Sequence, residues 1–137
     1  MPETSTYFAH GANAHGANAH GHWHPLAEYL RSVGETAARL AQGWAWADEA
    51  RLAGFLHDLG KYGDLFQKRL HGQASGLDHW SIGSLEAYLT HKAIGAALAI
   101  EGHHIGLQSA ASVDFANRLK QTESKHSTPT FSPRRTG

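Results

Sequence analysis

The chain has 137 residues, 41% of them hydrophobic and 18% charged, a composition that fits one globular domain and excludes fibrous and disordered chains. It contains no cysteine, which excludes a disulfide framework, a thiolate zinc site and a cysteine nucleophile. The formal net charge is zero, yet residues 1–117 hold seven Lys and Arg against eleven Asp and Glu, so this part lacks the basic field of a protein that grips duplex DNA unaided.

The N-terminal segment, residues 1–22, contains a tandem repeat of the five-residue unit HGANA. Gly, Asn and Ala at this spacing cannot bury a face, so the repeat is expected to lengthen a surface loop. Its imidazoles, and the two that follow it, can take up zinc or nickel loosely, away from any active site. These histidines are His10, His15, His20, His22 and His24.

Five helices are predicted after this segment, and no window of useful length alternates with the period of a strand. The first begins near Pro25, carries an apolar stripe and ends before Gly43. The second is expected to be capped by Asp48 and ended by Gly60. The last three are expected over 64–70, 80–89 and 92–101. The fold class is therefore all-α.

The C-terminal tail differs in composition from the helical part. Residues 118–137 hold five Lys and Arg against one Glu, and Ser, Thr and Pro are frequent from residue 121 onward, so the tail is expected to be disordered. The chain therefore divides into the repeat segment (1–22), a helical domain (23–120) and a basic tail (121–137).

Three short motifs place histidine beside aspartate or a second histidine at the ends of separate predicted helices. A single His-Asp pair would be explained by a polar helix end, where histidine stabilises the negative end of the dipole. Three such pairs in an all-α chain indicate one metal centre, because imidazole and carboxylate together suit Mn²⁺, Fe²⁺, Co²⁺, Ni²⁺ or Zn²⁺. The pairs are His57-Asp58, Asp78-His79 and His103-His104.

The order H-D-x-G-K, then D-H, then G-H-H-x-G-L resembles the HD superfamily of metal-dependent phosphohydrolases. The chain is most similar to the HD nuclease domain of the CRISPR-associated helicase-nuclease of type I interference systems, over about residues 7–107. This resemblance implies an HD-domain helical bundle. The motifs that carry it are Tyr7-Phe8-Ala9-His10, Trp23-His24-Pro25-Leu26-Ala27-Glu28, Leu56-His57-Asp58-Leu59-Gly60-Lys61-Tyr62, Phe66-Gln67 and Gly102-His103-His104-Ile105-Gly106-Leu107.

The resemblance also implies roles for single residues. Asp58 and Lys61 would act in catalysis, the carboxylate by anchoring metal and the lysine by pairing with a phosphate oxygen. The implied reaction is metal-assisted hydrolysis of a phosphodiester in single-stranded DNA, with Mn, Fe, Co, Ni or Zn as the ion and Mg also possible. The implied metal ligands are His57, Asp58, His79, His103 and His104.

Three departures from the family pattern bear on activity. Tyr29 stands where the family has a histidine in P-L-x-x-H-L, and Trp80 replaces a small polar residue. The family's late aspartate has no counterpart, since Asp114 lies too close to the His-His pair, so the domain is expected to be C-terminally truncated. One metal site is therefore expected to be well formed and the second incomplete. The complete ligand set is Asp58, His79, His103 and His104.

Three functions compete on these observations. The first is a single-strand DNA endonuclease of CRISPR interference, an antiviral defence, working with a helicase on the same or a separate chain and with an RNA-guided surveillance complex. The second is an HD phosphohydrolase acting on nucleotides. The third is an inactive remnant or docking module, favoured by Tyr29. The residues MPETSTYFAH form no secretory signal and no apolar run approaches the ~20 residues of a membrane span, so a cytoplasmic protein without a membrane partner is expected.

Overall fold

A computed structural model describes residues 6–11, 22–76, 78–106, 117, 120 and 121 of the chain. This part is mainly helical, which confirms the all-α class, with one two-stranded ribbon as the exception. Apart from residue 121, the tail that is expected to be disordered lies outside the described residues. None of the helices described is long and apolar enough to cross a bilayer. The elements are β1 (Phe8–His10), β2 (His24–Pro25), α1 (Leu26–Leu40), α2 (Ala47–Leu56), the 3-10 helix η1 (Leu59–Tyr62), α3 (Asp64–Leu70), α4 (Ser81–Leu89) and α5 (Ile94–Ile105).

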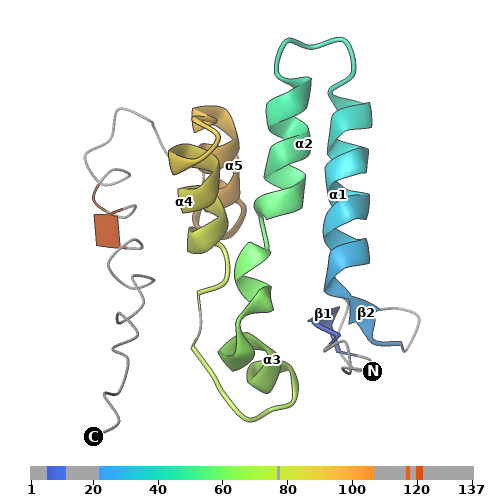
Figure 1. Ribbon diagram of the computed structural model, residues 1–137, viewed down its shortest axis with the longest axis vertical. Helices are drawn as coiled ribbons and strands as arrows, with labels where there is room; N and C mark the ends of the chain where they lie inside the picture. The colour runs from blue at the N-terminus through green and yellow to red at the C-terminus, as the bar shows by residue number, and fades with distance from the viewer. Residues whose placement is uncertain (1–5, 12–21, 77, 107–116, 118–119, 122–137) are drawn as a thin grey trace, which may run out of the picture.

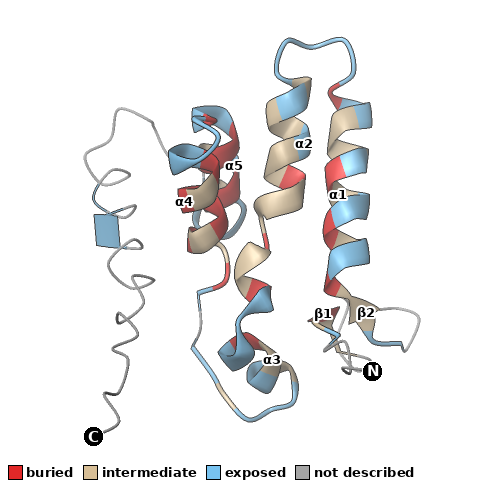
Figure 2. Cartoon of the chain, in the orientation of Figure 1, coloured by how far each residue is buried: buried red, intermediate tan, exposed pale blue. Residues whose placement is uncertain are grey.

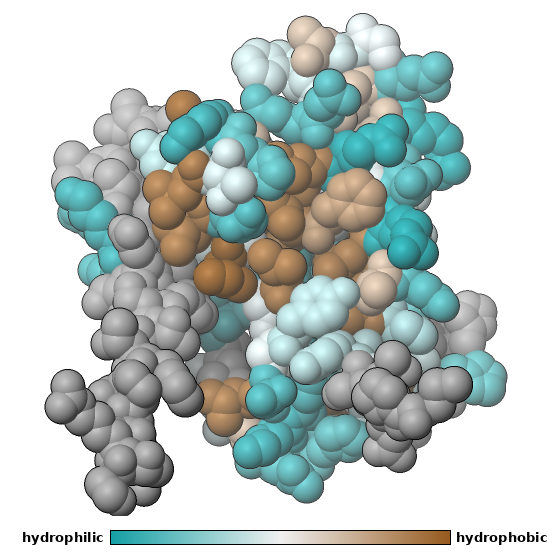
Figure 3. Space-filling model, in the orientation of Figure 1, coloured by the Kyte–Doolittle hydropathy of each residue, from teal (hydrophilic) through white to brown (hydrophobic). Residues whose placement is uncertain are grey.

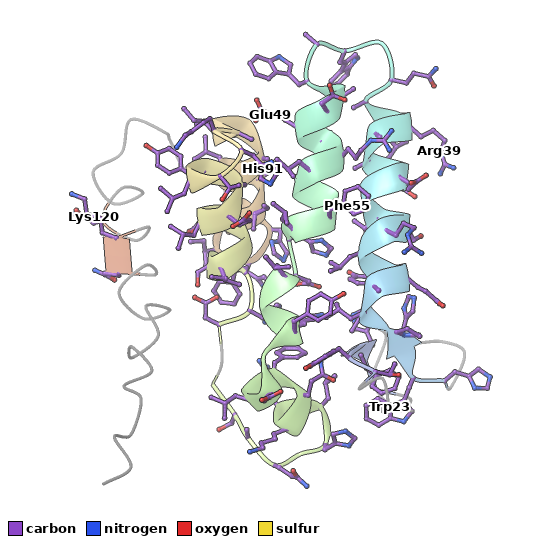
Figure 4. The ribbon with its side chains drawn as sticks, viewed as in Figure 1. Trp23, Arg39, Glu49, Phe55, His91 and Lys120 are labelled. Atoms are coloured by element: carbon purple, nitrogen blue, oxygen red, sulfur yellow. The ribbon has the colours of Figure 1, made fainter. Side chains whose placement is uncertain are left out.

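Helix α2 occupies the middle of the molecule (Figure 1). It packs against α1 on one side and against α4 and α5 on the other. Two glycines let α1 and α2 approach closely, since a Cβ on Gly54 would lie 2.6 Å from the Cα of Gly34. Phe55 extends from α2 toward α1 (Figure 4), and its ring would lie 3.0 Å from a Cβ on Gly34. The sequence therefore places small residues where the helix pair is tightest.

Two clusters of buried hydrophobic residues support the described part of the fold. The larger one joins α4 and α5 to α2, and Figure 2 shows how strongly the buried positions concentrate in α4 and α5. Hydrophobic side chains also gather on the viewed surface over α4 and α2 (Figure 3). The smaller cluster joins the ribbon to α1 through Ala9, Leu26 and Leu30. The polar residues of the site, described below, contact members of both clusters.

The helix boundaries differ from prediction at both ends of α2 and at the C-terminal end of α5. Helix α2 begins at Ala47 and ends at Leu56, so Asp48 lies in its first turn and does not cap it. Gly60 does not end this helix, because the chain has already turned at His57 and continues as η1. Helix α5 extends to Ile105, so the His-His pair lies within its last turn and does not follow it.

The ribbon of β1 and β2 is the element that the sequence pattern did not indicate. Residues 8–10 pair antiparallel with residues 24–25, and the amide of Leu26 donates to the carbonyl of Tyr7. Gln67 on α3 binds both backbone groups of Phe8 through its side-chain amide. Residues 8–10, which belong to the N-terminal segment 1–22, thus pack as part of the folded unit. Strands of three and two residues are too short for period-two alternation to be visible.

Candidate metal centre

Asp58 lies where α2 gives way to η1, and its side chain is buried. Its Oδ1 lies 3.3 Å from Nε2 of His79 and 3.7 Å from Nε2 of His103. Its Oδ2 lies 2.9 Å from Nζ of Lys61 and 3.3 Å from Nε2 of His57. One carboxylate therefore divides the site into an Oδ1 side that faces imidazoles and an Oδ2 side that faces a lysine and a further imidazole.

The Oδ1 side brings together four residues whose ligand atoms all lie within 4.8 Å of one another, so the cluster could hold a metal ion. Within the described part of the chain, Oδ1 of Asp58 is buried and makes no hydrogen bond, although imidazole nitrogens lie near it. A buried acceptor without a partner costs about 1–3 kcal/mol, a cost that a bound cation removes. The donor set therefore fits a divalent transition ion. Its members are Asp58, His79, His103 and His104.

Gly60 explains how His79 comes to lie beside Asp58. The amide of Gly60 donates to the carbonyl of His79 at 3.1 Å, and a Cβ on Gly60 would lie 2.6 Å from that oxygen. The glycine of the H-D-x-G-K motif is thus required for a close backbone approach. Asp78 fixes the other side of His79, since its Oδ1 accepts from the amides of Trp80 and Ser81, both at 3.0 Å.

Backbone carbonyls orient two of the imidazoles. Nδ1 of His103 lies 2.6 Å from the carbonyl of Ile100, and Nδ1 of His57 lies 2.8 Å from the carbonyl of Gly54. A carbonyl only accepts, so Nδ1 is the protonated nitrogen and a neutral ring presents its Nε2 lone pair to the site. This arrangement is usual for metal-binding histidines. His104 is held differently, by stacking on Trp80 with ring centroids 4.4 Å apart.

The Oδ2 side is filled by groups of the protein itself. The ammonium of Lys61 is buried, and besides Asp58 it donates to the carbonyl of Ala9 at 3.2 Å. The hydroxyl of Tyr29 lies 3.2 Å from Nε2 of His57, to which it donates when the ring is neutral. Tyr29 is the residue that replaces the expected histidine. On this side a tyrosine hydroxyl stands where the family resemblance implies a further metal-binding histidine, and the lysine of the H-D-x-G-K motif pairs with the carboxylate.

Burial and charge shift several pKa values in the site. Burial alone would raise the pKa of Asp58, but contacts with His103, His57, His79 and Lys61 hold that pKa well below its ordinary value. Burial would lower the pKa of His103, but its contacts with Asp58 and the Ile100 carbonyl raise it.

His104 and Tyr29 shift in directions that keep both groups neutral. Burial, followed by the charges of His103 and His79, lowers the pKa of His104. Burial, followed by the charge of Asp58, raises the pKa of Tyr29. The carboxylate is therefore charged near neutral pH, and His104 offers a lone pair there.

The structure brings together four of the five expected ligands, while His57 lies on the Oδ2 side. Lys61 contacts Asp58 and Ala9, and its contact with a phosphate oxygen stays a prediction. Asp114 lies outside the described residues. Trp80, which the sequence marks as a large replacement beside a candidate ligand, stacks on His104, and that stacking was not predicted.

Comparison with known proteins assigns no family and no function to the chain. No protein-family model, no curated protein and no solved structure matches it. The geometry of the site and the motifs of the sequence are therefore the basis for a functional proposal.

Proposed function

We propose that the chain is a metal-dependent phosphodiester hydrolase of the HD type, with one divalent ion bound on the Oδ1 side of Asp58. The observation that carries this proposal is the environment of the Asp58 carboxylate. Its Oδ1 faces imidazoles, whereas its Oδ2 pairs with the buried ammonium of Lys61. The ion would be held by a carboxylate oxygen and three imidazoles, a donor set that suits Zn, Mn, Fe, Co or Ni. The ligands would be Asp58, His79, His103 and His104.

A bound ion of this kind lowers the pKa of a water ligand and so supplies hydroxide near neutral pH. The residues of the chain position the other groups. Lys61 directs two of its three N–H donors at Asp58 and Ala9, which leaves one for a phosphate oxygen of the substrate. Tyr29 holds His57, and His57 in turn flanks the carboxylate. We expect these groups to fix the charge and orientation of Asp58 during the reaction.

The finer proposal is an HD-domain nuclease that cleaves single-stranded DNA in CRISPR interference, and it is supported by the motif resemblance. The acidic balance of residues 1–117 also supports delivery of the strand by a partner, because this part of the chain has little attraction for a free polyanion. A helicase and an RNA-guided complex would supply the strand, in the cytoplasm.

The test is cleavage of circular single-stranded DNA by the full chain with Mn²⁺, beside an Asp58→Ala variant purified identically. A His91→Ala variant is the matched control, because His91 is an exposed histidine that contacts Glu86 on the surface. Cleavage that is lost in the first variant and retained in the second is the expected result.

Two further arms, nucleotides and duplex DNA, separate the competing functions. Hydrolysis of nucleotides without cleavage of circular DNA would contradict the nuclease and favour the nucleotide phosphohydrolase. A folded, metal-loaded chain that hydrolyses none of the three substrates would overturn the proposal and leave a docking module.

A further inference from the structure

We propose a second metal site, formed by His10 and His24 on the paired strands β1 and β2, that binds a divalent transition ion such as Zn²⁺, Ni²⁺ or Cu²⁺. This site is separate from the Asp58 centre and does not depend on the proposed hydrolase function. It assigns a role to two of the histidines that border the HGANA repeat.

The pairing of the strands sets the geometry. His10 and His24 are direct partners in the antiparallel ribbon, and side chains of directly opposed residues leave a sheet on the same face. Their ring centroids are 6.0 Å apart, with an angle of 37° between the ring planes. Zinc–nitrogen bonds are about 2.0–2.1 Å long, so two rings at this separation can share one ion when a nitrogen of each ring faces it.

His10 also has an unmet bonding requirement. Its Nδ1 is buried and has no hydrogen-bond partner among the residues that the structure describes. The hydroxyl of Tyr29, whose ring contacts His10, lies 3.2 Å from Nε2 of His57. A buried nitrogen without a partner destabilises the fold, and a coordinated ion offsets that cost.

Tyr29 forms one wall of this second site. Its ring meets His10 edge-on at 4.9 Å and His24 edge-on at 5.3 Å between centroids. The two imidazoles are therefore held by the same aromatic surface. Imidazole is a preferred ligand of Zn²⁺, Ni²⁺ and Cu²⁺, and two imidazoles leave further positions on the ion for water.

The charges nearby predict which site fills first. Lys61 donates to the carbonyl of Ala9, the residue next to His10, and pairs with Asp58, so its positive charge lies close to both sites. The two proposed ligands include no carboxylate to offset it. The Asp58 centre has a carboxylate and three imidazoles, so the first equivalent of metal should bind there and the second, more weakly, at His10 and His24.

An ion at this position would act on the ribbon. By joining His10 to His24 it holds β1 against β2 in addition to their backbone pairing. The carbonyl of Ala9 lies on β1 and accepts from Lys61, so a firmer ribbon also fixes that contact. The second site is therefore expected to stabilise the folded chain without taking part in hydrolysis.

The test is calorimetric titration of the full chain with Zn²⁺ in a background where His15, His20 and His22 are all changed to Ala. Two equivalents should bind. Adding His10→Asn and His24→Asn should remove the weaker one and leave the tighter one, whereas adding His103→Ala should weaken the tighter one alone. A single equivalent in the background protein, or two that persist after the His10 and His24 changes, would overturn the proposal.

A second measurement covers failure of the double variant to fold. In the background protein, the imidazole NMR signals of His10 and His24 should shift as the second equivalent of Zn²⁺ is added, after those of the Asp58 centre have shifted. Signals that stay unchanged at two equivalents would overturn the site. Neither measurement involves hydrolysis, so this site and the proposed function can fail independently.

Discussion

The hydroxyl of Tyr29 lies 3.2 Å from Nε2 of His57, at the position where the family pattern has a metal-binding histidine. Because its pKa is raised, the hydroxyl of Tyr29 stays protonated near pH 7 and acts as a hydrogen-bond donor. It therefore does not replace the histidine as a metal ligand. On the Oδ2 side of Asp58, the side chains are thus held in place by hydrogen bonds and by the charge of Lys61.

Tyr29→Phe should leave zinc affinity at the Asp58 centre within about twofold, because the hydroxyl is a hydrogen-bond donor to His57 and no ligand. Loss of the hydrogen bond should lower the free energy of unfolding by about 0.5–1.5 kcal/mol. Calorimetric titration and thermal unfolding measure the two effects. Tyr62→Phe, at a partly exposed ring, is the control and should change neither. Loss of zinc binding in Tyr29→Phe would make the tyrosine a ligand.

Lys61→Met should destabilise the metal-free chain by about 3–5 kcal/mol, since it leaves the buried Asp58 carboxylate without its ammonium partner. Zinc affinity should rise at the same time, because the metal then meets a carboxylate whose charge no lysine offsets. Chemical unfolding and zinc titration measure the two quantities. Lys68→Met, at an exposed lysine of α3, should change neither. A fall in zinc affinity would contradict the assignment of Lys61 as a charge partner.

His104→Ala should weaken zinc binding by at least about tenfold, because it removes one of four ligands at the Oδ1 side. His91→Ala is matched in residue type but sits at the surface against Glu86, and it should leave the affinity unchanged. Competition with a coloured chelator measures both. Equal affinities for the two variants would remove His104 from the ligand set.

Zinc affinity should fall as the pH decreases, beginning above the ordinary histidine pKa of 6.5, because His103 has a raised pKa and must lose its proton to bind metal. In the metal-free chain, the contribution of His103 to stability changes with pH in the opposite direction. The raised pKa of His103 stabilises the fold below pH 6.5, and this contribution is lost as the pH rises through the folded-state pKa.

Thermal unfolding with and without Zn²⁺ between about pH 5.5 and 8 checks the pH effect. The rise in Tm on adding zinc should grow with pH. The His103→Ala variant should show a flatter dependence, and a wild-type dependence as flat as that of the variant would count against the role of His103.

Gly60→Ala should lower both stability and zinc affinity, since its Cβ would lie 2.6 Å from the carbonyl oxygen of His79 and would push the two segments apart. Such overpacking costs about 1–3 kcal/mol. Gly63→Ala, where the nearest atom would be 3.2 Å away and φ is −70°, should cost less. Unfolding curves and zinc titration of both variants are the measurement. Equal effects would show that the approach of Gly60 to His79 is unimportant.

Helices were predictable where periodicity and end signals agree. The prediction for 64–70 matches α3 at both ends, and the apolar stripe of α1 ends at Leu40 as expected before Gly43. Gly43 has a φ of 86°, the left-handed conformation expected of a glycine after a helix. The end of α2 was not predictable, because the turn at His57 and Asp58 depends on contacts with α4 and the ribbon and not on local propensity.

The convergence of Asp58, His79, His103 and His104 was predictable from motif order, since each lies at or near the end of a helix. The division of the carboxylate of Asp58, with imidazoles at Oδ1 and Lys61 and His57 at Oδ2, was not predictable. It depends on Lys61 reaching both Asp58 and the carbonyl of Ala9, a backbone group 52 positions away with no signature in the sequence. Backbone acceptors of this kind become visible only when the strand pairing is known.

Apart from its first residue, His10 of β1, the five-residue repeat lies in the connection between β1 and β2, residues 11–23. The entropy of closing a loop grows slowly with length, by about 0.6 kcal/mol for each doubling, so one unit more or less changes the cost by a few tenths of a kcal/mol. Copies of the gene that gain or lose a unit would therefore encode chains of nearly equal stability, with the partners of the ribbon unchanged. The number of repeat units can therefore change between lineages without selection through the stability of the fold.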